Sequence, residues 1–295
     1  MEQVKKKQHH QTLVFILFLV ILFRNSGSSS SESSQNGKHH FVLVHGACHG
    51  AWSWYKVTTL LKSWGHNVSA IDLGASGVNE KKALELKSIS EYFEPLSEFM
   101  GSSSVGEGER VVLVGHSFGG LAISYAMEHF PNKISVVVFV SAFMPGPTLN
   151  ASIVNQKALS KLSPNLDNQY SYDEGPNKPA TTFLFGPRFL ASRLYQLSPK
   201  QDWNLATTLM RPLRLFSNED MTKVLTFSHT KYGSVNRVFV KSEKDLVATP
   251  DLQRWMIEHN PPHRVVKIAG SDHMVMMSKP IDLSLHLQSI AASYN

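Results

Sequence analysis

The sequence predicts an α/β fold, in which helices cover both faces of a mostly parallel central sheet and a helical cap is inserted into the chain. Short apolar runs, beginning with residues 41–44, are typical of strands that are buried on both faces. These runs alternate with helical segments, as they do in proteins with a parallel sheet. Between about residues 143 and 225 the alternation is lost, because prolines separate short amphipathic segments. We therefore expect this stretch to form the cap over the carboxyl-terminal edge of the sheet.

The elements before the interruption follow from local signals. A turn containing Gly46 and Gly50 separates the first strand from a helical stretch. A Gly/Ser-rich linker after residue 100 precedes the third strand, and Pro131 ends the helix that follows that strand. The expected strands are residues 41–44, 68–72, 111–114 and 134–140, and the expected helices are residues 51–64, 89–100 and 121–129.

After the interruption the alternation resumes, with apolar runs for two more strands and two amphipathic stretches for helices. The expected strands are residues 237–240 and 265–268, and the expected helices are residues 252–259 and a last one from residue 281. A chain of 295 residues with 42% hydrophobic and 18% charged content is long enough for one full domain. We assign that domain to residues 39–295.

Residues 1–38 have the composition of a leader rather than of a folded domain. Lysines at positions 5–7 precede an unbroken apolar run at residues 13–23, and small residues follow at 26–28. A bilayer crossing takes about 20 apolar residues, so the run is short for a span but suits a signal peptide. We expect a secretory signal in residues 1–28, followed by a Ser-rich linker. Cleavage would place the protein in the secretory pathway or outside the cell, whereas an uncleaved segment would leave a short anchor or a cytoplasmic chain.

Composition excludes several classes of function. The formal net charge is +6, but half of that excess lies in residues 1–38, and no Lys/Arg run is interleaved with aromatic residues. We therefore expect no nucleic-acid partner, and membrane contact only through the leader. Cys48 is the single cysteine, so neither an intramolecular disulfide nor a CxxC motif can form. No metal and no cofactor are expected.

The motif with the clearest chemistry is G-x-S-x-G at residues 115–119. An apolar strand directly precedes it and a helix directly follows it, which is the context of a nucleophile elbow. Such a turn exposes the serine hydroxyl at the top of the sheet, beside the free N–H groups of a helix N-terminus. The motif predicts an α/β-hydrolase fold with Ser117 as the nucleophile.

A serine hydroxyl needs a base within hydrogen-bond reach and a third group that orients the base. In this fold the order along the chain is Ser, acid, His. His273 follows the last expected strand in a loop of small residues, so we expect it to be the base. Asp245, on the loop after the preceding strand, is the expected acid, and Glu243 on the same loop is the alternative.

Acyl transfer also requires donors for the tetrahedral oxyanion. The N–H of Phe118, the residue after the nucleophile, is the first expected donor. The second comes from the loop after the first strand, where Gly46 allows close approach of the backbone and the N–H of Ala47 can donate. His45, Cys48 and His49 lie in the same loop, but they lack a partner cluster elsewhere in the sequence that would make them a metal site.

Several stretches resemble the plant methylesterase and hydroxynitrile lyase family of α/β-hydrolases, from about residue 39 to the end of the chain. They are residues 40–54 (HFVLVHGACHGAWSW), 72–77 (DLGASG), 115–120 (GHSFGG), 185–187 (FGP), 253–255 (QRW) and 271–274 (SDHM). The resemblance implies hydrolysis of methyl esters of small plant acids such as salicylate, jasmonate or indole-3-acetate. It does not cover the leader, which typical members lack. The loop at residues 241–246 differs in spacing from the acid loop of the esterases, which leaves Glu243 open as the acid.

The family contains two chemistries, and two positions discriminate between them. The resemblance implies that lyases carry a threonine at the position of Gly46 and a lysine directly after the histidine, where this chain has Met274. Departing cyanide would therefore lack a cation, whereas an alcohol needs only a proton from His273. An esterase is favoured over a hydroxynitrile lyase, and a small-molecule receptor without turnover is the third reading.

The family's substrates occupy an apolar pocket under the cap, and we expect a small-molecule ester as the main partner. Gly46, Phe143 and Met274 are the residues we assign to substrate binding. Further apolar side chains from the expected cap could line the pocket, namely Phe183, Leu184, Phe185, Phe189, Leu190, Tyr195, Leu209, Met210 and Phe216. Core packing is the alternative for each of them singly. A homodimer is compatible with the sequence.

Overall fold

The computed structural model describes residues 37–162 and 165–294. The expected signal in residues 1–28, its apolar run at 13–23 and most of the linker lie outside these residues. Within the described part of the chain, no helix combines the length and the apolar character that a bilayer crossing requires.

The described domain is built on a six-stranded sheet whose paired strands are all parallel, in the order β2-β1-β3-β4-β8-β9. Every strand expected from an apolar run is present, with ends that differ by two residues at most. Their bounds are β1 His40–Val44, β2 Asn67–Ile71, β3 Val111–His116, β4 Ile134–Val140, β8 Arg237–Ser242 and β9 Arg264–Ile268. Strands β1, β3 and β4 are fully buried, as continuous apolar runs predict for strands covered on both faces.

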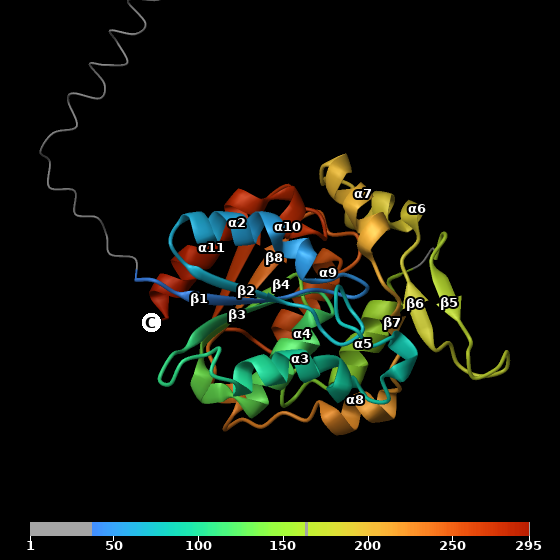
Figure 1. Ribbon diagram of the computed structural model, residues 1–295, viewed down its shortest axis with the longest axis horizontal. Coiled ribbons are helices and arrows are strands. Elements are labelled where there is room, and N and C mark those ends of the chain that lie inside the picture. Colours follow the sequence, from blue (N-terminus) through green and yellow to red (C-terminus); the bar gives the residue numbers. More distant parts are fainter. Residues whose placement is uncertain (1–36, 163–164, 295) are drawn as a thin grey trace, which may run out of the picture. The chain divides into compact units, whose positions relative to one another are not determined.

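Helices cover both faces of this sheet (Figure 1). Helices α2, α10 and α11 pack together on one face, and α3 and α4 pack together on the other. The α-helices outside the β4–β8 connection are α2 Tyr55–Ser63, α3 Ile89–Gly101, α4 Gly119–His129, α9 Pro250–His259, α10 Val275–Ser278 and α11 Pro280–Ser293, and a 3-10 turn Ala51–Trp54 precedes α2. The expected α/β-hydrolase architecture is therefore confirmed.

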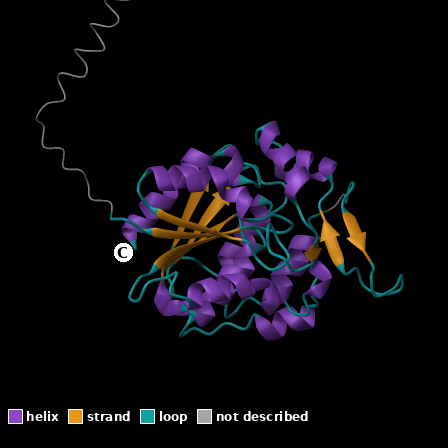
Figure 2. Cartoon of the chain, in the orientation of Figure 1, coloured by secondary structure: helices purple, strands orange, loops and turns teal. Residues whose placement is uncertain are grey.

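The connection between β4 and β8, residues 141–236, is called the insertion below. Its helices are α5 Ala151–Leu159, α6 Pro187–Phe189, a π-helical turn Leu190–Leu194, α7 Lys200–Leu209, α8 Asn218–Val224 and a 3-10 turn Tyr232–Ser234. It also contains a small antiparallel sheet, with strands β5 Gln169–Ser171, β6 Thr182–Leu184 and β7 Leu213–Arg214 (Figure 2). The purely helical expectation missed this sheet, because strands of two or three residues are too short to show a period of two.

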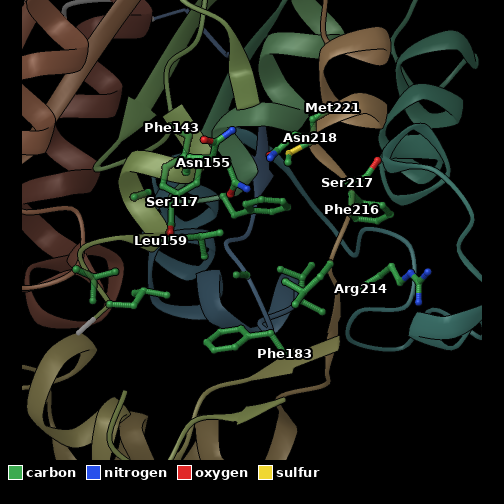
Figure 3. Close-up of a pocket in the computed structure, with 18 of the residues that line it drawn as sticks. Ser117, Phe143, Asn155, Leu159, Phe183, Arg214, Phe216, Ser217, Asn218 and Met221 are labelled. Atoms are coloured by element: carbon green, nitrogen blue, oxygen red, sulfur yellow. The ribbon is translucent and has the colours of Figure 1, made fainter. Parts of the chain in front are cut away.

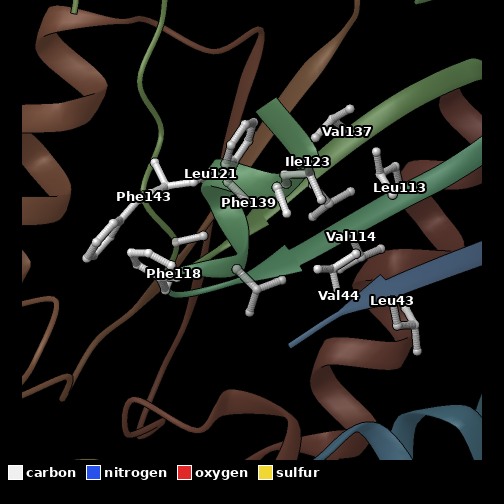
Figure 4. Packing of buried hydrophobic residues seen from close by; sticks show 14 of the residues in the cluster. Leu43, Val44, Leu113, Val114, Phe118, Leu121, Ile123, Val137, Phe139 and Phe143 are labelled. Carbon is white, nitrogen blue, oxygen red and sulfur yellow. The ribbon is translucent and has the colours of Figure 1, made fainter. Parts of the chain in front are cut away.

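A buried apolar core fixes the turn between β3 and α4. Val44 of β1, Val114 of β3 and Phe139 of β4 are fully buried, and Ile123 of α4 packs close to them (Figure 4). The carboxyl ends of these strands lie side by side, because β1 and β4 both pair with β3. The loops that follow the strands therefore meet at one edge of the sheet.

Candidate active site

Ser117 lies in the sharp turn that joins β3 to α4. Its φ is +51°, a left-handed conformation that costs a residue with a β-carbon energy. Two backbone hydrogen bonds hold Ser117 against the end of β4 and the loop that follows it. Ser117 N–H donates to Val140 O at 3.4 Å, and Phe143 N–H donates to Ser117 O at 2.9 Å. The strained geometry expected from G-x-S-x-G is present, and it directs the hydroxyl away from the sheet.

Gly119 allows the loop after β1 to lie directly against this turn. A β-carbon at this position would lie 2.3 Å from the carbonyl oxygen of His45, which no packed side chain tolerates. The second glycine of the motif therefore brings residues 45–50, which we call the oxyanion loop, next to Ser117.

His273 bridges Ser117 and Asp245. Its Nε2 lies 3.0 Å from Ser117 Oγ, and its Nδ1 lies 2.7 Å from Asp245 Oδ2. An ionised carboxylate can only accept, so Nδ1 carries the proton and Nε2 is left free to accept from the serine hydroxyl. Asp245 also accepts from Ser141 Oγ and from Val247 N–H, and it is 1% exposed. The three side chains thus have the mutual geometry of a nucleophile, its base and an orienting acid.

Glu243, the alternative acid, faces away from His273. Its carboxylate accepts from Gly270 N–H at 3.0 Å and lies 2.6 Å from Lys267 Nζ. The Lys267 ammonium and the Gly270 N–H lower the pKa of Glu243 to about 2. The contacts therefore distinguish the two candidate carboxylates: Asp245 contacts His273, and Glu243 contacts Gly270 and Lys267. The sequence alone could not make this distinction.

The two expected oxyanion donors flank Ser117. Ala47 and Phe118 line the same cavity as Ser117, and among the described residues neither backbone N–H has an acceptor. Two histidines hold the oxyanion loop: His45 Nδ1–H donates to Gly46 O at 2.8 Å, and His49 Nδ1–H donates to Ala47 O at 2.8 Å. These contacts assign His45 and His49 to loop geometry. In the part of the chain that the structure describes, no group of His, Cys, Asp or Glu is placed to hold a metal ion.

Three histidines near Ser117 are buried and neutral. Burial lowers the pKa of His49 to about 3, and it also lowers the pKa values of His45 and His116. His116 Nε2–H donates to the carbonyl oxygen of His273 at 2.9 Å, so this ring supports the loop at residues 270–274 and does not donate to the serine hydroxyl.

We predict that these histidines make the folded state sensitive to acid. Between pH 6.5 and about 3 the unfolded chain binds a proton at His49 that the folded chain does not, so stability falls as pH falls. The free energy of unfolding should drop by about 1.4 kcal/mol per pH unit for this residue. Urea denaturation from pH 7 to pH 4 measures the slope, and His49→Gln should make it shallower. An equal slope in both proteins would contradict the prediction.

A cavity of about 450 Å³ opens beside Ser117 and extends under the insertion (Figure 3). Its walls are mainly apolar. Among the side chains expected to line it, those that do so are Phe143, Phe183, Phe185 and Phe216. This volume and lining are typical of a site for a small organic molecule.

Other expected pocket residues lie elsewhere, and the sequence missed part of the real wall. Met274 is fully buried and does not line the cavity, and neither does Gly46, Leu184, Phe189, Leu190, Tyr195, Leu209 or Met210. Part of the missed wall comes from α5 and the turn after it, with Asn155, Ala158, Leu159 and Leu162. These residues have helical spacing, so the amphipathic pattern of residues 151–162 was the signal that could have found them.

Replacing Gly46 by threonine should lower esterase activity and should not create a lyase. A β-carbon at Gly46 would lie 2.9 Å from the β-carbon of Ser117 and 3.0 Å from His116 Nδ1. The serine would have to shift, and displacing a reacting group by about 1 Å costs roughly 100-fold in kcat/KM. Ester hydrolysis and cyanide release from mandelonitrile are the two assays. Unchanged hydrolysis or a gain of cyanide release would contradict this prediction.

The fold agrees with comparisons to known proteins. The sequence matches the alpha/beta hydrolase family over residues 41–284. Methyl jasmonate esterase 1 of Vitis vinifera is 55% identical over 257 residues, which are 87% of this chain and 98% of that protein. Salicylic acid-binding protein 2 of Nicotiana tabacum is 43% identical over 263 residues, which are 88% of this chain and 100% of that protein.

Solved structures give the same result. The crystal structure of tomato methylketone synthase I complexed with 2-tridecanone is 52% identical and superposes with a TM-score of 0.84, over 88% of this chain and 100% of the other. The family resemblance expected from the sequence is confirmed. The chain therefore belongs to the α/β-hydrolase family and, within it, to the plant methylesterases, which are serine hydrolases that act on carboxylic esters.

Proposed function

We propose that this chain hydrolyses methyl esters of small apolar plant acids, of the salicylate, jasmonate or indole-3-acetate type, through an acyl-enzyme on Ser117. The observation that carries the proposal is the hydrogen-bonded series Ser117–His273–Asp245, with distances of 3.0 and 2.7 Å, at one end of an apolar cavity. The insertion acts as the cap, because its residues form most of the wall over the serine.

The geometry supports a two-step reaction. Ser117 Oγ attacks the ester carbonyl while its proton passes to His273 Nε2, and the N–H groups of Ala47 and Phe118 stabilise the oxyanion. The tetrahedral intermediate collapses, and methoxide takes the proton from His273 and leaves as methanol. Water then attacks the acyl-enzyme with His273 as base, which releases the acid and restores the serine. Asp245 stabilises the imidazolium in both steps.

The cavity favours a neutral ester with an apolar acyl group. Phe143, Phe183 and Phe185 offer aromatic surface, while polar atoms at the wall come from side chains such as Asn155 and Asn218. The similarity to a methyl jasmonate esterase, at 55% identity, favours a jasmonate-type acid within this class.

A panel of methyl salicylate, methyl jasmonate and methyl indole-3-acetate tests the proposal. We expect release of methanol from at least one of them, with a kcat/KM well above that for methyl acetate, because the apolar wall stabilises only the larger acyl groups. A folded protein that hydrolyses none of them, nor a p-nitrophenyl ester, would overturn the proposal.

Formation of a methyl ketone from a β-keto acid is a second candidate, favoured by the 52% identity to methylketone synthase I. Loss of carbon dioxide from such an acid leaves an enolate, which needs a proton but no nucleophile. The 3.0 Å contact between Ser117 and His273 is what ester hydrolysis requires. β-Ketoheptanoate is the probe: Ser117→Ala should retain decarboxylation if that is the activity, and should lose ester hydrolysis if the main proposal holds.

A further inference from the structure

One short piece of the insertion contacts all three loops that hold the proposed site. We call residues 194–198, at the end of the π-helical turn, the clasp segment. It begins at the last residue of the π-helical turn Leu190–Leu194, and π-helical turns are rare and often occur at functional sites. The oxyanion loop, the acid loop at residues 243–247 and the histidine loop at residues 270–274 each form hydrogen bonds with it.

Tyr195 makes the contact with the oxyanion loop. Its hydroxyl lies 2.7 Å from His49 Nε2, and His49 Nδ1 lies 2.8 Å from Ala47 O. A carbonyl oxygen can only accept, so Nδ1 carries the proton, Nε2 accepts, and the tyrosine hydroxyl donates. The series therefore runs in one direction, from the Tyr195 hydroxyl through the neutral His49 ring to the carbonyl of Ala47.

Burial keeps both partners in the form that this series needs. Tyr195 is 3% exposed and His49 is 2% exposed. Burial raises the pKa of Tyr195 well above its usual value and lowers the pKa of His49 to about 3, so the phenol stays protonated and the ring stays neutral at physiological pH. The His49 ring is close to parallel with the rings of Trp52 and Tyr195, at interplanar angles of 29° and 19° and with ring centroids 5.3 and 5.9 Å away.

These contacts restrict the orientation of the expected second oxyanion donor. In a trans peptide the C=O and N–H groups point in opposite directions. His45 holds Gly46 O, which sets the peptide that carries the Ala47 N–H, and His49 holds Ala47 O on the other side of the same α-carbon. Because both flanking carbonyls are held, a rotation of the Ala47 N–H would break at least one of these hydrogen bonds.

The clasp segment holds the other two loops by hydrogen bonds to carbonyl and carboxylate groups. Gln196 Nε2–H donates to Lys244 O, next to Asp245, at 2.8 Å. The carboxylate of Asp272, next to His273, accepts from Leu197 N–H at 2.9 Å and from Ser198 Oγ at 2.8 Å. In addition, Met274 N–H donates to Leu194 O at 3.3 Å.

We propose that Tyr195 is a positioning residue, which acts through His49 to hold the Ala47 N–H in the geometry that stabilises the oxyanion. The insertion then has a second role besides covering the substrate, because its clasp segment aligns the loops of the reaction centre. This inference rests on the proposed ester hydrolysis. Tyr195 does not line the cavity, so its effect falls on the transition state and leaves substrate affinity unchanged.

Tyr195→Phe tests the inference, since it removes the donated hydrogen bond and keeps the ring. We expect kcat to fall roughly 3- to 10-fold, the value of one such bond, with KM unchanged. Tyr172→Phe is the matched control, because it removes a phenol from an exposed position of the same insertion, and it should match the wild type. Rates are expressed per active site titrated with a fluorophosphonate, so that poorly folded molecules do not contribute.

Two further measurements separate positioning from general packing. A trifluoromethyl ketone with the acyl group of the best substrate forms an oxyanion on the serine, and its Ki should rise in Tyr195→Phe by the same factor as kcat falls. The Ki of the free acid should not change. His49→Phe keeps an aromatic ring at position 49 but has no nitrogen for the Tyr195 hydroxyl to contact. Adding Tyr195→Phe to this variant should therefore lower kcat no further.

Additive losses in that double variant, or a rise in KM without a fall in kcat, would overturn the inference. Failure of the proposed function is distinguishable, because the wild type itself would then hydrolyse no ester. If the wild type turns over and Tyr195→Phe equals it in kcat and in inhibitor affinity, only the inference fails.

Discussion

Ser117→Ala is expected to lower kcat for ester hydrolysis by about 10⁴- to 10⁶-fold, because the variant has no oxygen that can form the acyl-enzyme. The oxyanion donors and the cavity remain, so a small residual rate over uncatalysed hydrolysis should persist. Substrate affinity, measured by equilibrium binding of the intact ester, should stay close to the wild-type KM.

Ser135→Ala is the matched control for that experiment. Ser135 is 8% exposed, as is Ser117, and its hydroxyl donates to Val111 O within the sheet. It should retain wild-type kcat/KM within about twofold, at a cost of about 1 kcal/mol in stability. A Ser117→Ala protein that keeps more than a hundredth of wild-type activity would contradict the role assigned to the serine.

Asp245→Asn is expected to lower kcat by about 10⁴-fold. An amide can donate to the histidine as well as accept from it, which favours the tautomer with the proton on Nε2, the wrong nitrogen for a base. The buried amide also cannot stabilise the imidazolium.

Glu243→Gln is the matched control, since it makes the same chemical change on the same loop. Its carboxylate contacts Gly270 N–H and Lys267, away from His273, so activity should stay within about twofold of wild type. The reverse result, an inactive Glu243→Gln and an active Asp245→Asn, would assign the acid role to Glu243.

The sequence predicted the sheet well because each central strand is a continuous apolar run. Residues 134–140, for example, read as a buried strand, and β4 has those bounds. The serine and the histidine were expected from their places at strand ends. The choice between Asp245 and Glu243 as the acid was not predictable from the sequence. It depends on the contacts that the Glu243 carboxylate makes with Lys267 of β9 and with the Gly270 N–H, which only the folded structure shows.

The insertion was the least predictable part, for physical reasons. Its strands β5 to β7 are held by pairing between residues distant in the chain, and they are too short for a local pattern. The contact of Tyr195 with His49 joins residues 146 positions apart, so no local signal marks it. The sequence suggested Tyr195 as a pocket residue, whereas its hydroxyl contacts His49 of the oxyanion loop and the residue does not line the cavity.

Partitioning of the acyl group between water and an added alcohol tests the acyl-enzyme on Ser117 most directly. The methyl and phenyl esters of one acid are turned over in buffer that contains ethanol, and the ratio of free acid to ethyl ester is measured for each. A shared acyl-enzyme predicts the same ratio from both esters, and from Ser117→Ala only the slow residual release of free acid, with no ethyl ester. A ratio that changes with the leaving group, or ethyl ester formed by Ser117→Ala at the wild-type rate, would contradict the account.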